Sequence, residues 1–247
     1  MKNIYKASMN RILKNWIFIG GCIIALVATF VFTANFIGMT GRFETMGHER
    51  RMIFMSIAMM GFYTIFVPLY TNAEYRDGTI RNKLIAGFSQ KDVYLGTLFS
   101  HITALGIMTL CYLIAGIAGG AQISADMLAK NIVLFFALCG YVSVMEFVAM
   151  RVQKTVAVAI GAFLILNVAY YIVMIGNFFI AFILKGTALI IGRIIYNTDV
   201  FGQWMIHVGL ADQESNPGNF TQIIISLVIV LLSVLLGTLG INKRDLN

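Results

Sequence analysis

Charged residues are scarce in this sequence. Lysine, arginine, aspartate and glutamate make up 12% of its 247 residues, roughly half of the share found in soluble globular domains. Hydrophobic residues make up 59%, and the mean hydropathy is +0.84. A chain of this composition is not expected to fold around a water-soluble core, so the question becomes how many stretches can cross a bilayer.

Cysteine is also rare, and its placement excludes two kinds of chemistry. Cys22, Cys111 and Cys139 all lie inside apolar stretches, and no Cys-x-x-Cys pair occurs, so neither a disulfide framework nor a zinc site is indicated. His48-Glu49 opens like a zinc-protease His-Glu-x-x-His motif, but the second histidine is absent. We therefore expect no metal or cofactor bound by this chain.

Two further absences limit the function. The sequence contains no Gly-x-x-x-x-Gly-Lys-Ser/Thr phosphate loop, so the chain is not expected to hydrolyse ATP and is not predicted to be an enzyme. Its formal charge of +7 is not accompanied by a soluble face of basic and aromatic residues, so nucleic acid is not an expected partner.

Six apolar stretches approach or exceed the 20 or so residues that a membrane-spanning helix needs. Lipid offers no water to satisfy backbone polar groups, so α-helices are expected. The third stretch contains His101 but no lysine, arginine, aspartate or glutamate, and the fourth contains Glu146 as its one charged residue. The other four contain no charged residue. The predicted fold is a single all-α integral membrane domain, 1–247, with spans at about 16–38, 52–73, 93–118, 131–150, 155–183 and 219–241.

The basic residues outside these spans predict the orientation. If the amino terminus is cytoplasmic, twelve lysines and arginines fall on inside segments and six fall on outside segments. The positive-inside rule therefore favours a multi-pass protein of the cell membrane with both termini in the cytoplasm.

Residues 1–15 have the pattern of an amphipathic helix that lies on the inner leaflet. A cleaved signal peptide is the alternative, but the apolar run that follows is too long and the basic region is too extended. The expected apolar face is Tyr5, Met9, Ile12, Leu13 and Trp16, with Lys2, Lys6, Asn10 and Lys14 largely opposite.

The segment 74–92, between the second and third spans, is the densest polar run in the chain. Pro68 before it is expected to kink or end the second span. Gly87 can take the left-handed conformation that ends a helix, and Ser89 with Asp92 fits a capping box that starts the next one. A helix here either docks on a partner or is solvated without one, and spacing alone does not decide. Its expected apolar face is Ile80, Leu84, Ile85 and Phe88, with Arg76, Arg81 and Lys83 on other faces.

Two titratable residues are predicted inside the membrane, where an ionised carboxylate costs about 3 kcal/mol at the bilayer centre. His101 is interpreted as a hydrogen-bonded interior residue, with a proton relay as the alternative. Glu146 lies about one turn from the inner surface and is interpreted as an ion pair with Arg151, Lys154 or a neighbouring helix. A coupling or gating charge is the alternative for Glu146.

The fifth span has about 29 residues without charge, more than a bilayer core of about 30 Å requires, so it is expected to tilt, break or project outward. The segment 185–218 that follows is the only sizeable external one. Its first part, 188–196, is apolar but too short to span alone, and 211–218 is polar. We expect re-entrant or surface helices here, followed by a turn.

Four features resemble the permease subunits of ABC-2 class ATP-binding-cassette exporters. Six spans have both ends inside, a long outer segment separates spans five and six, and Lys243-Arg244-Asp245-Leu246 is similar to the family's basic-basic-Asp ending. Glu74-x-x-x-Gly78-Thr79-x-x-x-x-Leu84 matches the family's pattern between spans two and three. After Leu84 the sequence departs from that pattern, because it lacks the proline and the arginine that often flank the serine corresponding to Ser89.

The resemblance implies that 74–88 is a cytoplasmic coupling helix seated in a separate ATPase subunit, which alone binds ATP and magnesium. A second permease copy or a paralogue would complete a dimer in the lipid membrane, and closure of the ATPase pair would rock the spans between inward-open and outward-open states. The implied coupling residues are Glu74, Arg76, Gly78, Thr79, Ile80, Arg81, Lys83, Leu84, Ile85 and Phe88. Because spans two and five face the path in this family, the implied substrate contacts are Phe62, Phe66, Asn167, Tyr170 and Tyr171.

The cargo implied by this resemblance and by the apolar, aromatic midline is hydrophobic or amphipathic: a peptide, a peptide antibiotic or a lipid-like compound. Export of sodium or a small drug by the same mechanism is an alternative. A secondary transporter or channel that uses His101 and Glu146 as titrating groups is a second alternative, although the internal repeats it predicts are not evident. A membrane-embedded enzyme would need a nucleophile–base pair, and none stands out in the sequence.

Overall fold

The computed structural model describes residues 1–38, 40–152 and 154–239, and every regular element in these ranges is helical. The elements, in chain order, are α1 (Lys2–Leu13), α2 (Trp16–Thr33), the short 3-10 turn η1 (Gly41–Phe43), α3 (His48–Met55), α4 (Ile57–Arg76), α5 (Thr79–Ile85), α6 (Gln90–Ala118), α7 (Ala125–Arg151), α8 (Thr155–Phe182), α9 (Gly186–Asn197), α10 (Val200–Val208), the 3-10 turn η2 (Gln213–Ser215) and α11 (Asn219–Thr238).

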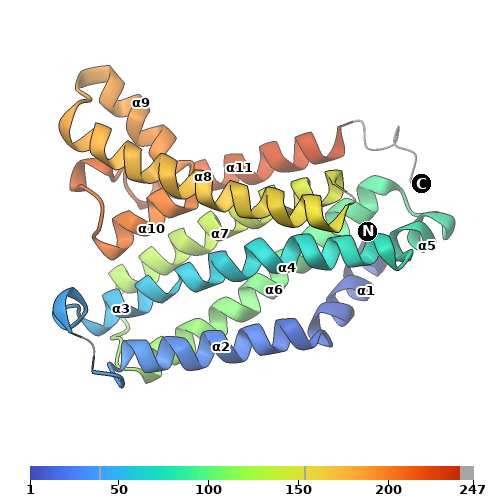
Figure 1. Ribbon diagram of the computed structural model, residues 1–247, viewed down its shortest axis with the longest axis horizontal. Coiled ribbons are helices and arrows are strands. Elements are labelled where there is room, and N and C mark those ends of the chain that lie inside the picture. The colour runs from blue at the N-terminus through green and yellow to red at the C-terminus, as the bar shows by residue number, and fades with distance from the viewer. Residues whose placement is uncertain (39, 153, 240–247) are drawn as a thin grey trace.

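Six helical stretches of the described chain are long and apolar enough to cross a membrane, and α3 and α4 together form the second of them. This confirms the all-α fold with six candidate spans. The long helices run up and down in one bundle, so that α1, α5 and the end of α11 gather at one end, called here the α1 end (Figure 1). The helices α9 and α10 lie at the opposite end, called here the α9 end.

The centre of the bundle is formed by α6 and α7. The helices α1 and α2 pack on α6, while α4 and α11 pack on α7, and α8 packs on α4. The outer helices α2, α8 and α11 leave most of their apolar side chains exposed. Water-soluble monomers rarely expose contiguous apolar surface on this scale, so these faces fit contact with lipid.

The first two spans differ in their limits from the predicted stretches. The first was expected to reach residue 38, but α2 ends at Thr33, and Asn35 adopts a positive φ of 56°. The second was expected to begin at residue 52, but helix begins at His48 because Arg51 is buried and donates to the backbone oxygens of Phe43 (3.1 Å) and Glu44 (3.0 Å). These bonds compensate the charge of the guanidinium, which hydropathy alone counts as a reason to end the span.

Pro68 lies inside α4 and does not end it, because the helix continues to Arg76. The loss of one backbone donor is tolerated in a helix that packs tightly on its neighbours. The polar residues Asn72 and Glu74 therefore lie on the same continuous helix as the apolar part of the span.

The helix α1 packs along the first half of α6, and the side that it buries differs from the predicted apolar face. Gly96 of α6 lets α1 approach so closely that an added methyl group would lie 2.7 Å from Ile4 Cγ2. Ile4 and Ser8 are buried although the predicted face omitted them, and Leu13 and Trp16 are exposed although that face included them. A pattern of 3.6 residues per turn finds the apolar stripe, but the partner helix decides which part of it is covered.

The segment between α8 and α11 contains two helices and a short turn. The first, α9, carries the apolar part that was predicted to be a surface or re-entrant helix. The second, α10, begins at the capping residue Asp199, whose carboxylate accepts from the backbone N–H of Phe201 at 2.9 Å. Trp204 anchors α10 by donating its indole N–H to the backbone oxygen of Ile53 at 3.2 Å.

Candidate functional site

A tight turn joins the second span to the short helix α5 at the α1 end. Gly78 adopts a left-handed φ of 67° between the end of α4 and Thr79, a conformation that costs other residues about 1 kcal/mol or more. Gly87 adopts a φ of 87° after α5, and Ser89 Oγ accepts from the backbone N–H of Asp92 at 3.0 Å to cap α6. The helix end at Gly87 and the capping box at Ser89 were both predicted from the sequence.

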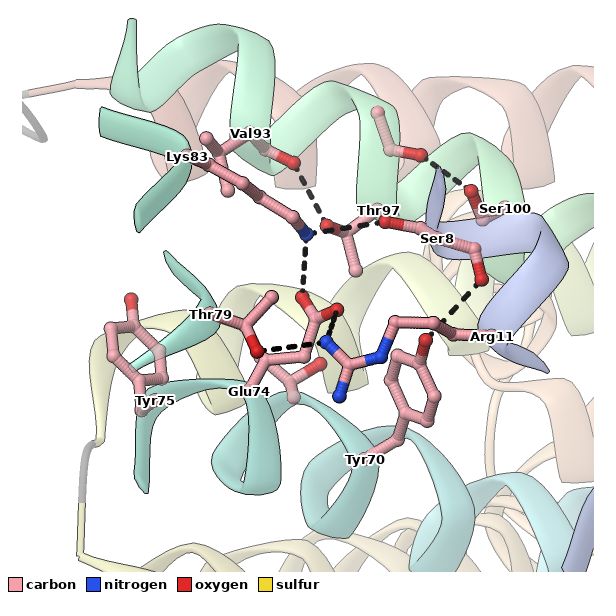
Figure 2. A network of polar contacts seen from close by, with 12 residues as sticks. Ser8, Arg11, Tyr70, Glu74, Tyr75, Thr79, Lys83, Val93, Thr97 and Ser100 are labelled. Atoms are coloured by element: carbon pink, nitrogen blue, oxygen red, sulfur yellow. Dashed lines mark hydrogen bonds and ion pairs between the residues drawn. The ribbon is translucent and has the colours of Figure 1, made fainter. Parts of the chain in front are cut away.

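Glu74, in the last turn of α4, is fully buried and lies between two cations. Its Oε2 accepts from Lys83 Nζ of α5 at 2.9 Å, and its Oε1 accepts from Arg11 Nη1 of α1 at 3.0 Å. Figure 2 shows the two basic side chains reaching the carboxylate from different elements. A buried carboxylate is stable only when such charge-assisted hydrogen bonds replace its lost hydration.

The same two cations each hold a further contact. Arg11 also donates to Thr79 Oγ1 at 2.9 Å, and Lys83 also donates to Ser8 Oγ at 3.3 Å. Thus α1, α4 and α5 are connected by four polar contacts around one carboxylate, which we call the Glu74 cluster (Figure 2). Because Glu74 is fully buried, the loss of either cation would leave its charge incompletely compensated, so these three elements are expected to move together.

The predicted coupling residues divide between an inner and an outer set. Glu74, Ile80 and Lys83 face the interior of the α1 end, so Ile80 is not available as part of an apolar surface for a partner. Ile85 is 75% exposed, and Arg81 beside it is exposed as well. Arg76 is also exposed and pairs with Asp77 at 3.4 Å. The remaining predicted residues are partly buried: Gly78, Thr79, Leu84 and Phe88.

His101 and Glu146 meet in the centre of the bundle. His101 Nδ1 lies 3.0 Å from Glu146 Oε2, and Thr71 of α4 donates to the same oxygen at 3.0 Å. All three side chains are fully buried. This agrees with the interpretation of Glu146 as paired with a neighbouring helix, whereas Arg151 instead donates to backbone oxygens of 236 and 239.

Aromatic rings cover this pair on one side. The rings of Phe66 and Tyr70 stand edge-on to the His101 ring, with centroid distances of 5.9 Å and 5.3 Å. The two atoms of the pair that point away from this contact, His101 Nε2 and Glu146 Oε1, are buried and have no hydrogen-bond partner among the described residues. The pair is therefore isolated from the surface by apolar rings and is incompletely satisfied.

The five expected substrate contacts fall in two places. Phe62 and Phe66 of α4 stack on each other at 5.1 Å, and both are directed toward α2, where an added methyl group on Gly21 would lie 2.4 Å from the Phe62 ring. On α8, Tyr170 and Tyr171 are exposed, and Asn167 donates to the backbone oxygen of residue 163 at 2.8 Å. A path between two copies that brings the two sets together stays a prediction.

Sequence reasoning missed the partners of the cluster rather than its centre. Arg11 and Ser8 carried no signal, because Arg11 was counted only as a basic residue of the inner segment and Ser8 is a small polar residue on an amphipathic helix. Contacts across 63 and 75 residues, as for Glu74 with Arg11 and for Lys83 with Ser8, depend on the packing of α1. The ending Lys243-Arg244-Asp245-Leu246 lies outside the described residues.

Neither a scan against protein-family models nor a search of curated proteins finds a match for this chain.

Proposed function

We propose that this chain is the membrane-spanning permease subunit of an ATP-binding-cassette exporter of the ABC-2 class, with both termini in the cytoplasm. The observation that supports the proposal most strongly is the Glu74 cluster, which connects the short helix α5, between two candidate spans, to α4 and α1. The cluster fixes α5 to α4 and α1, so that a displacement of α5 reaches both of these helices. A helix that receives force from another protein requires such a connection.

In this mechanism the exposed face of α5 is the contact for the partner ATPase. Ile85 supplies an apolar side chain, and Arg81 supplies a cation at its edge. When the ATPase pair closes on ATP, the push on α5 passes through Lys83 to Glu74 and from there to α4 and α1. The second span and the amino-terminal helix receive the push together, and their packing passes it on to α6 and α7.

The cargo is proposed to be hydrophobic or amphipathic, such as a peptide, a peptide antibiotic or a lipid-like compound. The outer helices carry broad apolar faces, and α8 adds the exposed pair Tyr170 and Tyr171. Such faces suit a path that forms between two permease copies and accepts cargo with a large apolar surface. Sodium or a small drug remains the alternative cargo for the same machine.

The test is a substitution on the outer face of α5. Ile85→Asp is expected to abolish the coupling of ATP hydrolysis to export, because it places a charge in the apolar contact. Ile123→Asp is the matched control, since Ile123 is 66% exposed in the connection between α6 and α7, at the other end of the bundle. Normal export by Ile85→Asp, with ATP consumption unchanged, would refute the coupling role.

A second candidate function is favoured by the meeting of His101 and Glu146. Two titratable groups in hydrogen-bond contact inside the bundle are what a proton-coupled secondary transporter needs. That function predicts transport in sealed vesicles driven by a pH gradient without ATP. Transport that stops when ATP is removed while the gradient is kept would exclude it.

A further inference from the structure

A cavity of about 480 Å³ opens at the α1 end between α1, the start of α2 and the second half of α4. Its size lies within the range of roughly 300–1,000 Å³ that is typical of ligand sites. It exists because α1 and α2 pack mainly on α6, whereas α4 packs mainly on α7 and α8. The space between α2 and α4 is therefore left lightly filled.

One half of the lining is polar and carries more positive than negative charge. Lys14 and Arg11 contribute two cations, and Asp77 contributes the one carboxylate of the lining. Arg11 is held by the Glu74 cluster, while Lys14 has no ion-pair partner among the residues that the structure describes. Asn15 accepts at its Oδ1 from the backbone N–H groups of 17 and 18, which fixes its amide at the mouth of the cavity.

The other half of the lining is apolar and faces outward along the bundle. Ile17, Ile65 and Leu69 line it, and each keeps 38% or more of its side chain exposed. The rings of Phe66 and Tyr70 close its inner wall. An apolar wall that is open to the outside of a membrane bundle suits an acyl chain.

The polar half lies at the level where the membrane surface is expected. Trp16 follows Asn15 directly and is 80% exposed, and tryptophan is enriched at the interface between headgroups and acyl chains. The charged residues of the cavity lie at or just beyond the ends of α1 and α4, whereas Ile65 and Leu69 lie further along α4, toward the middle of its span. Along the axis of the bundle the lining therefore changes from polar to apolar, as a phospholipid changes from its headgroup to its acyl chains.

We propose that this cavity binds a phospholipid with an anionic headgroup. The phosphate lies between Lys14 and the amide of Asn15, and an acyl chain follows Ile17, Ile65 and Leu69. Asp77, the one carboxylate of the lining, already pairs with Arg76 at 3.4 Å, so the cationic end of a zwitterionic headgroup finds no free carboxylate among the lining residues. The proposal rests on the membrane placement of the bundle and does not require an ATPase partner.

The test is lipid retention by the purified full-length chain. The protein is reconstituted in nanodiscs with equal amounts of phosphatidylglycerol and phosphatidylcholine of identical acyl chains, and the retained lipids are counted by native mass spectrometry. Lys14→Gln is compared with Lys6→Gln, which removes the same charge from an exposed position of α1 outside the cavity. A third sample receives sn-glycerol 1-phosphate in detergent without lipid.

The expected result is that wild type and Lys6→Gln retain phosphatidylglycerol over phosphatidylcholine, and that Lys14→Gln lowers this ratio about fivefold, as expected for one lost cation near a headgroup. Leu69→Gln, in the apolar wall, is expected to lower the retention of both lipids. An equal loss in the Lys6 and Lys14 variants would show general surface attraction and overturn the proposal. Retention of glycerol phosphate as strong as that of the lipid would overturn the assignment to a lipid.

Discussion

His101 Nδ1 and Glu146 Oε2 lie 3.0 Å apart, which brings together the one histidine and the one carboxylate of the six predicted apolar stretches. Thr71 adds a third helix to the contact by donating to the same oxygen. The pair therefore joins α4, α6 and α7 at the centre of the bundle. This position gives the pair a structural role, because a buried carboxylate that loses its partner destabilises the fold.

Replacement of His101 by leucine should destabilise the bundle by about 3–5 kcal/mol, because it leaves the buried Glu146 with only one of its two hydrogen-bond partners. Glu146→Gln should cost less, since an amide can still accept from Thr71. The double variant of His101→Leu with Glu146→Leu should regain part of the loss. Unfolding in a titration with sodium dodecyl sulfate measures all three, and a His101→Leu variant as stable as wild type would contradict the structural role.

Lys83→Met should release α5 from the bundle without unfolding the spans, because it removes one of the two cations that compensate Glu74. Amide hydrogen exchange over Thr79–Ile85 is expected to accelerate by at least tenfold, which corresponds to a local loss of about 1.4 kcal/mol. The matched control is Lys91→Met, which removes the same charge from an exposed position of the next helix. Equal exchange in both variants would show that Lys83 does not hold α5 in place.

The α9 end should show two opposed pH effects on stability. Burial raises the pKa of Asp199 from 3.8 to about 6, and burial lowers the pKa of His207 from 6.5 to about 4. The stability linked to Asp199 is present at low pH and is lost as the pH rises toward 6. The stability linked to His207 is present above pH 6.5 and is lost as the pH falls through about 4.

Single substitutions should separate these effects. In Asp199→Asn, which keeps the helix cap, His207 is the one of these two groups that still titrates, so the unfolding temperature relative to His207→Gln should rise as the pH increases from 4 to 6.5. In His207→Gln, only Asp199 titrates, and the unfolding temperature should fall as the pH increases from 3.8 to about 6. Parallel pH profiles for the two variants would show that these groups are not buried as described.

Close packing at Gly96 gives a test of the position of α1. Gly96→Ala should destabilise the protein by about 1–3 kcal/mol, because the added methyl group meets Ile4 and the backbone of Tyr5. Gly106→Ala, on the same helix, meets only Phe135 at 4.0 Å and should be neutral or stabilising by up to about 1 kcal/mol. Thermal unfolding of the purified variants measures both, and a reversal of the order would place α1 elsewhere.

The sequence predicted those features that depend on local patterns. Hydropathy located the six candidate spans, and the turn chemistry of Gly87 and Ser89 located the end of α5 and the start of α6. Pro68 was less informative, since packing against neighbouring helices lets α4 continue through it. Local patterns of this kind are decided within one or two turns of helix.

The contacts that define the site are not local, and the sequence could not predict them. Glu74 and Lys83 were both assigned to the surface for a partner, but the packing of α1 buries the first completely and the second largely. The ion pair of Glu74 with Arg11 and the contact of His101 with Glu146 each join separate helices. A charge pattern indicates that such residues need partners, and only the tertiary arrangement decides which partners they find.

The central claim is that the outer face of α5 contacts an ATPase in the cytoplasm. The most direct test places a photoreactive phenylalanine analogue at position 85 in living cells and identifies the cross-linked protein by mass spectrometry. Position 24 of α2 is the matched control, because Ile24 is 67% exposed on a candidate span and Ile85 is 75% exposed. The account predicts that position 85 yields an adduct with a phosphate-loop ATPase and that position 24 does not. Adducts of position 85 with lipid or with extracellular protein alone would contradict it.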